Sequence, residues 1–193
     1  FSSALYVRGG TPDQNLIMLD GITVYNPYHL GGIFSTFNTD AIKEADFYAG
    51  GFPARYGGRM GAILNVINRE GNTERFEGHA NISLISSKIL MEGPLPKFKG
   101  LKGSWMIAGR RTYFDTFFNA ICGEECEEIG FKFPYFFYDY QLKVNIDLNQ
   151  DHRLTYSRFY GDDVLDFSFK PTVYENYDIL SDYYEESTNT FGI

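Results

Sequence analysis

The sequence predicts a mainly β protein, with a small α+β unit over residues 1–72 followed by antiparallel strands over residues 73–193. Two changes along the chain lead to this prediction. Residues 1–75 hold 11 of the 20 glycines, whereas residues 76–193 hold 24 of the 34 aromatic residues. Beyond Gly71-Asn72 the apolar residues also begin to alternate with polar ones, which is the period of a half-buried strand. We therefore expect little strand pairing between the two parts.

In the first unit, short apolar runs predict short strands. Residues 16–19 form such a run and end at Asp20-Gly21, which is a turn signal, and residues 22–25 resume as a strand. Farther along, Asn38 or Thr39 can cap one short helical turn.

A glycine-rich turn and a buried strand complete the first unit. Residues 47–48 lead as a strand into residues 50–59, where four glycines in ten positions indicate positive φ angles or close approach to another surface. The apolar, β-branched segment around residues 63–67 predicts a strand that is buried on both faces.

The second part contains about five predicted strands, at residues 76–85, 89–95, 104–113, 138–148 and 153–160. Residues 138–148 alternate without a break. One face holds Tyr138, Tyr140, Leu142, Val144, Ile146 and Leu148, and the other holds Asp139, Gln141, Lys143, Asn145 and Asp147. This pattern matches a membrane-spanning β-strand of about 9–11 residues. A soluble antiparallel sandwich, in which the apolar face is the core, would also alternate.

The connections distinguish these alternatives. Residues 96–100 and 149–152 are short, whereas residues 114–134 and 162–182 are long, and a short amphipathic helix fits residues 112–121. Alternating short and long connections are typical of an outer-membrane barrel. If that is the fold, the apolar face of residues 138–148 points away from the first unit.

Composition excludes some partners. The net charge of −8 argues against a nucleic-acid backbone, which would require a clustered basic face. Cys122 and Cys126 lie four residues apart among glutamates, and without a second pair or a histidine cluster they are a weak zinc signal. A short-loop disulfide is the favoured interpretation and free thiols are the alternative. We expect no cofactor and no metal.

No catalytic set is apparent in the sequence. A nucleophile elbow, a phosphate loop and a His-Glu-x-x-His motif are all missing, so we expect no enzyme. Asp162, Asp163 and Asp166 could bind Ca²⁺ in an external loop, although a solvated acidic loop explains them better.

Four motifs in order suggest a family. They are Arg8-Gly9, the apolar run that ends at Asp20-Gly21, the Tyr56-Gly57 turn and the Asn65-Val66-Ile67 strand. This order and spacing resemble the plug domain of a TonB-dependent outer-membrane receptor. Residues 92–95 and 109–113 look like early barrel strands of the same family, particularly of the variety with a carboxypeptidase-regulatory-like domain before the plug. The resemblance departs at Ala49, where many receptors have Arg or Lys.

The resemblance implies a piece of a Gram-negative outer-membrane receptor that binds a ligand outside and imports it to the periplasm with energy from the inner membrane. The partners it implies are a TonB-type energising complex acting through an N-terminal segment that is missing here, outer-membrane lipid, and an external ligand such as an oligosaccharide or a siderophore, with or without a surface lipoprotein. The alternatives are a surface-sensing receptor of the same fold without transport and a soluble β-rich carbohydrate-binding domain.

The resemblance also places the loop after Asp20-Gly21 at the apex of the plug. Tyr25, Asn26, Tyr28 and His29 lie in this loop and combine flat apolar rings with hydrogen-bonding groups, which suits a polar ligand. We expect these four side chains to be exposed on the same side as the long connection 114–134. The alternative is that they pack against the barrel wall.

Charged residues are expected to join the plug to the wall. Arg8, Arg55 and Arg59 lie beside glycines in the plug, and the polar face of residues 138–148 offers Asp139 and Asp147, so we expect bidentate pairs between the two groups. Arg110 and Arg111 are neighbours in one predicted strand and must therefore point to opposite faces.

Overall fold

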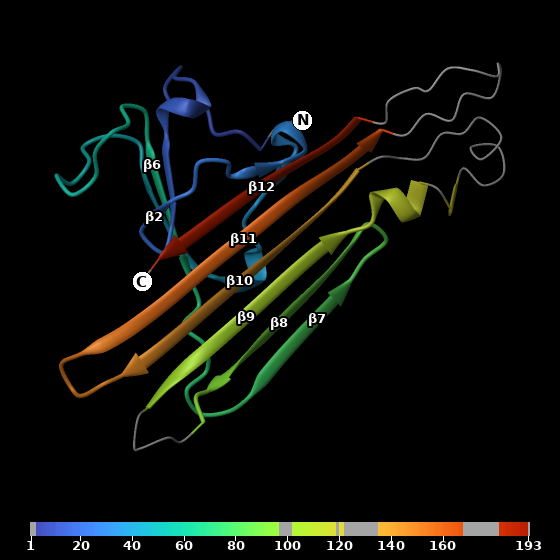
Figure 1. Ribbon diagram of the computed structural model, residues 1–193. Coiled ribbons are helices and arrows are strands. Elements are labelled where there is room, and N and C mark those ends of the chain that lie inside the picture. The colour runs from blue at the N-terminus through green and yellow to red at the C-terminus, as the bar shows by residue number, and fades with distance from the viewer. Residues whose placement is uncertain (1–2, 97–101, 119, 122–134, 168–181, 193) are drawn as a thin grey trace, which may run out of the picture.

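The computed structural model describes residues 3–96, 102–118, 120–121, 135–167 and 182–192, with the backbone alone at 166–167 and 182–192 (Figure 1). Two main sheets are present, one in each part of the chain, and no strand pairing joins them within these residues. A small two-stranded hairpin belongs to the first part.

The first sheet has four strands in the order β2-β1-β6-β5. These are β1 (Leu16–Leu19), β2 (Ile22–Thr23), β5 (Ile42–Tyr48) and β6 (Ile63–Asn68). β1 runs parallel to β6, and the other pairs are antiparallel. Most of β6 is buried, as its apolar sequence predicts.

Tight turns join these strands. Asp20 and Gly21 have φ angles of 51° and 82°, so the predicted turn is confirmed. Three 3₁₀ turns, η1 (Pro12–Gln14), η2 (Leu30–Gly32) and η3 (Thr39–Ala41), and the hairpin of β3 (Tyr28–His29) and β4 (Phe34–Ser35) complete the unit. Asn38 caps η3 by accepting the Asp40 N–H at 3.2 Å, which confirms one of the two predicted caps.

The second sheet has six antiparallel strands that follow one another in chain order. They are β7 (Glu77–Ile82), β8 (Ser86–Pro94), β9 (Lys102–Thr112), β10 (Tyr135–Asp147), β11 (Arg153–Phe167) and β12 (Asp182–Gly192). A helical segment over residues 114–118 begins the connection after β9, where a short helix was predicted. In Figure 1 the strands run side by side and the first unit lies across one face of the sheet.

The sequence analysis predicted fewer strands for this sheet than the structure contains. It did not predict β12, because residues 182–192 lack the alternation of apolar and polar residues. Gly161-Asp162-Asp163 suggested a loop, yet β11 continues through these residues and pairs with β10 as far as Leu165. Backbone pairing with the long strand β10 overrides the preference of these residues for a loop.

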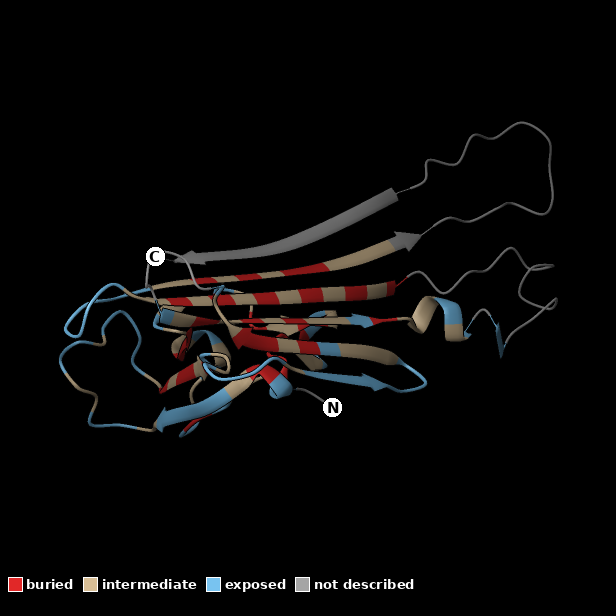
Figure 2. Cartoon of the chain, turned by 90° about the horizontal axis from the view of Figure 1, so that it is seen from below, coloured by how far each residue is buried: buried red, intermediate tan, exposed pale blue. Residues whose placement is uncertain are grey.

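The two faces of β10 differ as predicted. Burial alternates along this strand, so that buried and half-exposed bands follow one another in Figure 2. Gln141, Lys143 and Asn145 are buried, and the last two bond to the first unit. Leu142 and Val144 lie on the opposite, half-exposed face. A soluble sandwich would bury the apolar face instead, so the predicted orientation is confirmed.

Two apolar clusters connect the parts. Phe159 from β11 packs into the core of the first sheet, which consists mainly of Ile17, Leu19, Val24, Phe37 and Val66. Ala41 packs in turn against Leu90, Met106 and Ala108 of β8 and β9. None of the helical segments within the described ranges has the length and apolar character to cross a membrane.

The segment between the two sheets passes close to β9. Gly71 has a φ of 86°, and a Cβ at this position would collide with the backbone carbonyl of Trp105. Both the left-handed backbone and the close approach require glycine here.

We expect Gly71→Ala to lower the free energy of unfolding by about 1–3 kcal/mol, because it adds left-handed strain and a backbone clash. The measurement is the midpoint of urea unfolding of the intact protein in detergent. Gly57→Ala is the control, because a Cβ there meets no atom within 4 Å. Equal midpoints for the two variants would contradict this account of Gly71.

Candidate functional site

The candidate site is the interface between the first unit and the polar face of the second sheet, together with the loop that follows β2. Its contacts follow the inward side chains of β10 along the strand. Asn145 and Lys143 bond to the segments around residues 70 and 20, and Asp139 and Phe137 lie beside His29.

The carboxylate of Asp20 is the centre of the interface. Its Oδ1 accepts hydrogen bonds from Lys143 Nζ at 2.7 Å and from the Asn68 backbone N–H at 3.0 Å. Its Oδ2 accepts from Ser157 Oγ at 2.7 Å and from Asn68 Nδ2 at 3.0 Å. The side chains of Lys143 and Asp20 are 7% and 8% exposed, so this is a largely desolvated ion pair with further hydrogen bonds to its carboxylate. The sequence explained Asp20 only as a turn residue.

Backbone carbonyls of the first unit also bond to the sheet. Glu70 O accepts from Ser104 Oγ at 2.5 Å and from Asn145 Nδ2 at 2.9 Å. Arg110 donates to Ser35 O at 2.9 Å. Arg69 forms an ion pair of 2.8 Å with Glu92, whose side chain is buried. The sequence analysis missed this pair, because it assigned no role to Arg69 or to the inward-facing Glu92.

His29 is buried rather than exposed, so the expectation of exposure was wrong for this residue. Its side chain is 4% exposed, and Nδ1 lies 2.7 Å from Asp163 Oδ1. Nε2 lies 3.2 Å from Thr36 Oγ1, and the ring stacks on Phe137 with 4.1 Å between centroids. The cause is the β3–β4 hairpin, which folds this part of the loop back onto β10 and β11.

One end of the β3–β4 hairpin lies near the start of the long connection, because the Phe34 ring of β4 lies 5.4 Å from the ring of Phe114. That Tyr25, Asn26 and Tyr28 lie on the same side as this connection stays a prediction. Asp163 near the end of β11 binds His29, and Asp162 accepts from Tyr138 and Tyr160. These two aspartates are strand residues, so neither the Ca²⁺ loop nor the solvated acidic loop describes them. No metal-binding group of three or more His, Cys, Asp or Glu residues occurs within the described ranges.

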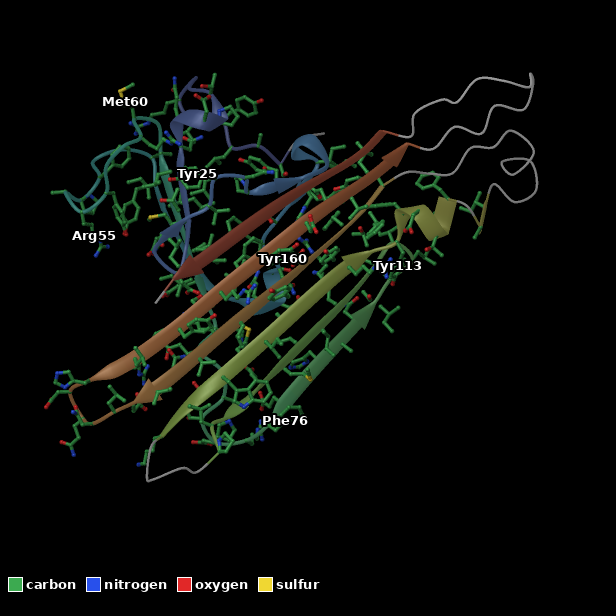
Figure 3. All side chains as sticks on the ribbon, viewed as in Figure 1. Tyr25, Arg55, Met60, Phe76, Tyr113 and Tyr160 are labelled. Carbon is green, nitrogen blue, oxygen red and sulfur yellow. The ribbon has the colours of Figure 1, made fainter. Side chains whose placement is uncertain are left out.

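The first residues of the loop remain accessible. Tyr25 is 85% exposed (Figure 3), Asn26 and Tyr28 are half-buried, and the Tyr28 hydroxyl accepts the Leu5 N–H at 3.0 Å. Tyr25, Asn26 and Tyr28 share a hollow of about 260 Å³ with Arg59. Its other lining residues are Pro12, Asp13, Asn15, Ile17, Thr23, Val24 and Pro27. Phenol rings, an amide and a guanidinium together suit a polar or anionic ligand.

The predicted arginine pairs with the wall do not form. Arg8, Arg55 and Arg59 are exposed in the first unit, and Arg55 stacks at 4.8 Å over its neighbour Tyr56. Figure 3 shows Arg55 at the edge of the first unit, away from the second sheet. The glycine-rich turn that carries Arg55 and Arg59 points away from β10, which explains the difference.

The expected acidic partners are used by the sheet itself. Asp139 pairs with Arg110 at 2.6 Å, and Asp147 pairs with Arg153 at 2.6 Å. Arg110 thus lies on the inward face, whereas Arg111 is exposed and lies over the Phe136 ring, as their adjacency predicts. Cys122 and Cys126 lie outside the described residues.

Comparison with known proteins supports the resemblance found in the sequence. Residues 1–63 match the family model of the TonB-dependent Receptor Plug Domain. Among solved structures, the chain is similar to the pyoverdine outer membrane receptor FpvA from Pseudomonas aeruginosa PAO1 bound to pyoverdine, with 22% identity and a TM-score of 0.49. The alignment covers 83% of this chain and 22% of that receptor, so this chain spans less than a quarter of its length. Residues 1–63 are therefore similar to the plug domain of TonB-dependent receptors.

Proposed function

We propose that the chain is part of an outer-membrane transporter that binds a ligand from outside and passes it to the periplasm, driven by an inner-membrane TonB complex. Residues 1–72 are the plug and residues 73–193 the first strands of the barrel. The observation that carries the proposal is the sidedness of β10, whose polar face binds the plug domain while its apolar face points away. Lipid outside and a hydrated lumen inside would produce this division.

The plug–wall contacts suit a plug that must rearrange. Most of them are hydrogen bonds and ion pairs, which water can replace when the plug moves. The apolar contacts are concentrated at Phe159, Ala41 and Phe34. A force transmitted from the periplasm would therefore have to break a limited set of interactions, which includes the buried Asp20–Lys143 ion pair.

The ligand site in this proposal is the hollow at Tyr25, Asn26, Tyr28 and Arg59. Because Tyr25 and Arg59 are exposed, the Tyr25 ring and the Arg59 N–H donors are available to a ligand. The buried His29 holds the loop against the second sheet through its contact with Asp163. The combination of aromatic rings with a guanidinium fits an anionic chelate or an oligosaccharide that carries acidic groups.

Uptake in whole cells tests the transport function. A panel of ferric siderophores and labelled oligosaccharides is supplied to cells that express the full-length receptor, with and without the energising complex. Accumulation that requires both the receptor and the complex supports transport. Binding at the cell surface without accumulation would indicate a sensing receptor instead.

For the ligand site, we expect the double variant Tyr25→Ala/Arg59→Ala to weaken binding of the transported compound at least about tenfold, because it removes an exposed ring and a charged donor from the hollow. The measurement is equilibrium binding to purified receptor. Arg55→Ala is the matched control, because Arg55 lies in the same turn but does not line the hollow. Equal affinities for the double variant and the control would rule out this hollow.

For the plug–wall contact, we expect Asp20→Asn to loosen the plug, because Lys143 becomes a buried charge without its counterion, at a cost of about 3–5 kcal/mol. Asparagine tolerates the left-handed conformation, so the turn itself is preserved. Hydrogen exchange of β1 and β6 in the full-length receptor should accelerate at least about a hundredfold.

Two further variants complete that experiment. Adding Lys143→Met to Asp20→Asn removes the unpaired charge and should recover part of the protection. Arg75→Met breaks an exposed ion pair with Glu77 and should change exchange little. Unchanged exchange in Asp20→Asn would show that the pair does not hold the plug.

A further inference from the structure

The outward face of the second sheet contains an apolar hollow of about 430 Å³. Two neighbouring rows of paired residues cross strands β7 to β10 and form it. The first row is Ala80, Ile89, Gly109 and Tyr140, and the second is Ile82, Ser87, Arg111 and Tyr138. Lys88, Arg110 and Asp139 also border the hollow, but their side chains reach ion-pair partners on the inward face. The hollow thus lies on the face opposite the plug.

Gly109 creates the depth of the hollow, because it leaves a gap between Ile89 and Tyr140. Its backbone is not in the left-handed region, and a Cβ there would meet Ile89 Cγ2 at 3.7 Å and Asp139 O at 3.8 Å. Both are ordinary van der Waals distances. Neither the backbone nor the packing therefore requires glycine at residue 109, and the open space needs another explanation.

Arg111 provides a positive charge at the rim of this hollow. It is exposed, and its guanidinium lies 4.9 Å from the centre of the Phe136 ring. Within the described residues, this guanidinium has no hydrogen bond and no ion pair. Asp162, a carboxylate on the same face, is 1% exposed, accepts from the Tyr138 and Tyr160 hydroxyls and forms no ion pair with Arg111.

The position of Arg111 indicates at which depth of a membrane the hollow would lie. It lies one residue before the end of β9, next to the long connection that begins with the helical segment 114–118. Tyr138, Tyr140 and Tyr160 lie at the same end of the outward face, and their rings form a chain of aromatic contacts. Tyrosines and arginines gather at the level of lipid headgroups, whereas the residues farther along β10, Leu142, Val144 and Ile146, suit hydrocarbon.

We propose that this hollow binds an outer-leaflet lipid whose phosphate headgroup has a net negative charge. One acyl chain lies over Gly109 between Ile89 and Tyr140, and Arg111 binds the phosphate through its fork of N–H donors. Free phosphate would use only the rim and leave the apolar hollow empty. An apolar protein segment would fill the hollow but leave Arg111 without a counterion. This inference rests on the proposed outer-membrane location.

Lipid binding by the full-length receptor tests the inference. The purified receptor in mild detergent is titrated with phosphatidic acid and, separately, with phosphatidylcholine of the same acyl chains, and bound lipid is counted by native mass spectrometry. The wild type should bind phosphatidic acid at least about tenfold more tightly. Arg111→Gln should abolish that preference, and Gly109→Val should weaken binding of both lipids by filling the hollow.

Gly78→Val is the matched control for the filled hollow. Gly78 lies in β7 on the same outward face, its Cβ would have contacts of 3.8–3.9 Å, and it does not line the hollow. This variant should bind both lipids like the wild type. Unchanged lipid binding in Gly109→Val would overturn the inference. An altered oligomeric state in that variant, with lipid binding unchanged, would assign the hollow to a protein contact instead.

Two further outcomes separate the possible causes. Displacement of phosphatidic acid by millimolar inorganic phosphate alone would indicate a simple anion site and contradict the role of the acyl chain. Ligand uptake is measured on the wild type and on the same variants. A wild-type receptor that binds the lipid but imports no ligand would disprove the proposed transport and support the lipid site.

Discussion

The buried ion pair between Asp20 and Lys143 determines how the two parts of the chain fit together. A carboxylate removed from water must be compensated almost completely, and Asp20 achieves this with four donors. Two of them, on Lys143 and Ser157, come from neighbouring strands of the second sheet. The left-handed turn aims the carboxylate at those strands, so the geometry of a single turn fixes the position of β1 and β6 against the wall.

The division between polar and apolar faces follows from the same arrangement. On the inward side of β10, Lys143 and Asn145 bond to the first unit, and Asp139 and Gln141 lie on the same buried face, so the apolar side chains are left for the outward face. A soluble protein would have no use for this arrangement, since its largest apolar surface would remain exposed. In the proposed bilayer location that surface is covered, and the proposed movement of the plug would separate a polar interface rather than a large apolar core.

Local patterns predicted the parts of this structure that depend on local physics. The apolar run before Asp20-Gly21, the cap at Asn38 and the alternation of β10 each depend on a few adjacent residues. The contacts of Asp20 and His29 could not be predicted in this way, because their partners lie 123 and 134 residues away in sequence. The prediction of arginine–aspartate pairs was wrong for the same reason. The sequence gives the charges of Arg55 and Asp139 but not the direction of the turn that carries Arg55.

Glycines in this chain have two physically different roles, and the distinction matters for function. Gly71 is required by the fold, because its backbone is left-handed and β9 passes against it. Gly109 lies in a regular strand with room for a side chain, and glycine there weakens the strand by exposing backbone and packing nothing. Because Gly109 lowers the stability of the strand and its backbone does not require glycine, its presence is best explained by a molecule that occupies the space above it. On the outward face of this sheet, beside an exposed arginine and a group of tyrosines, the chemistry of that space matches a lipid with an anionic headgroup.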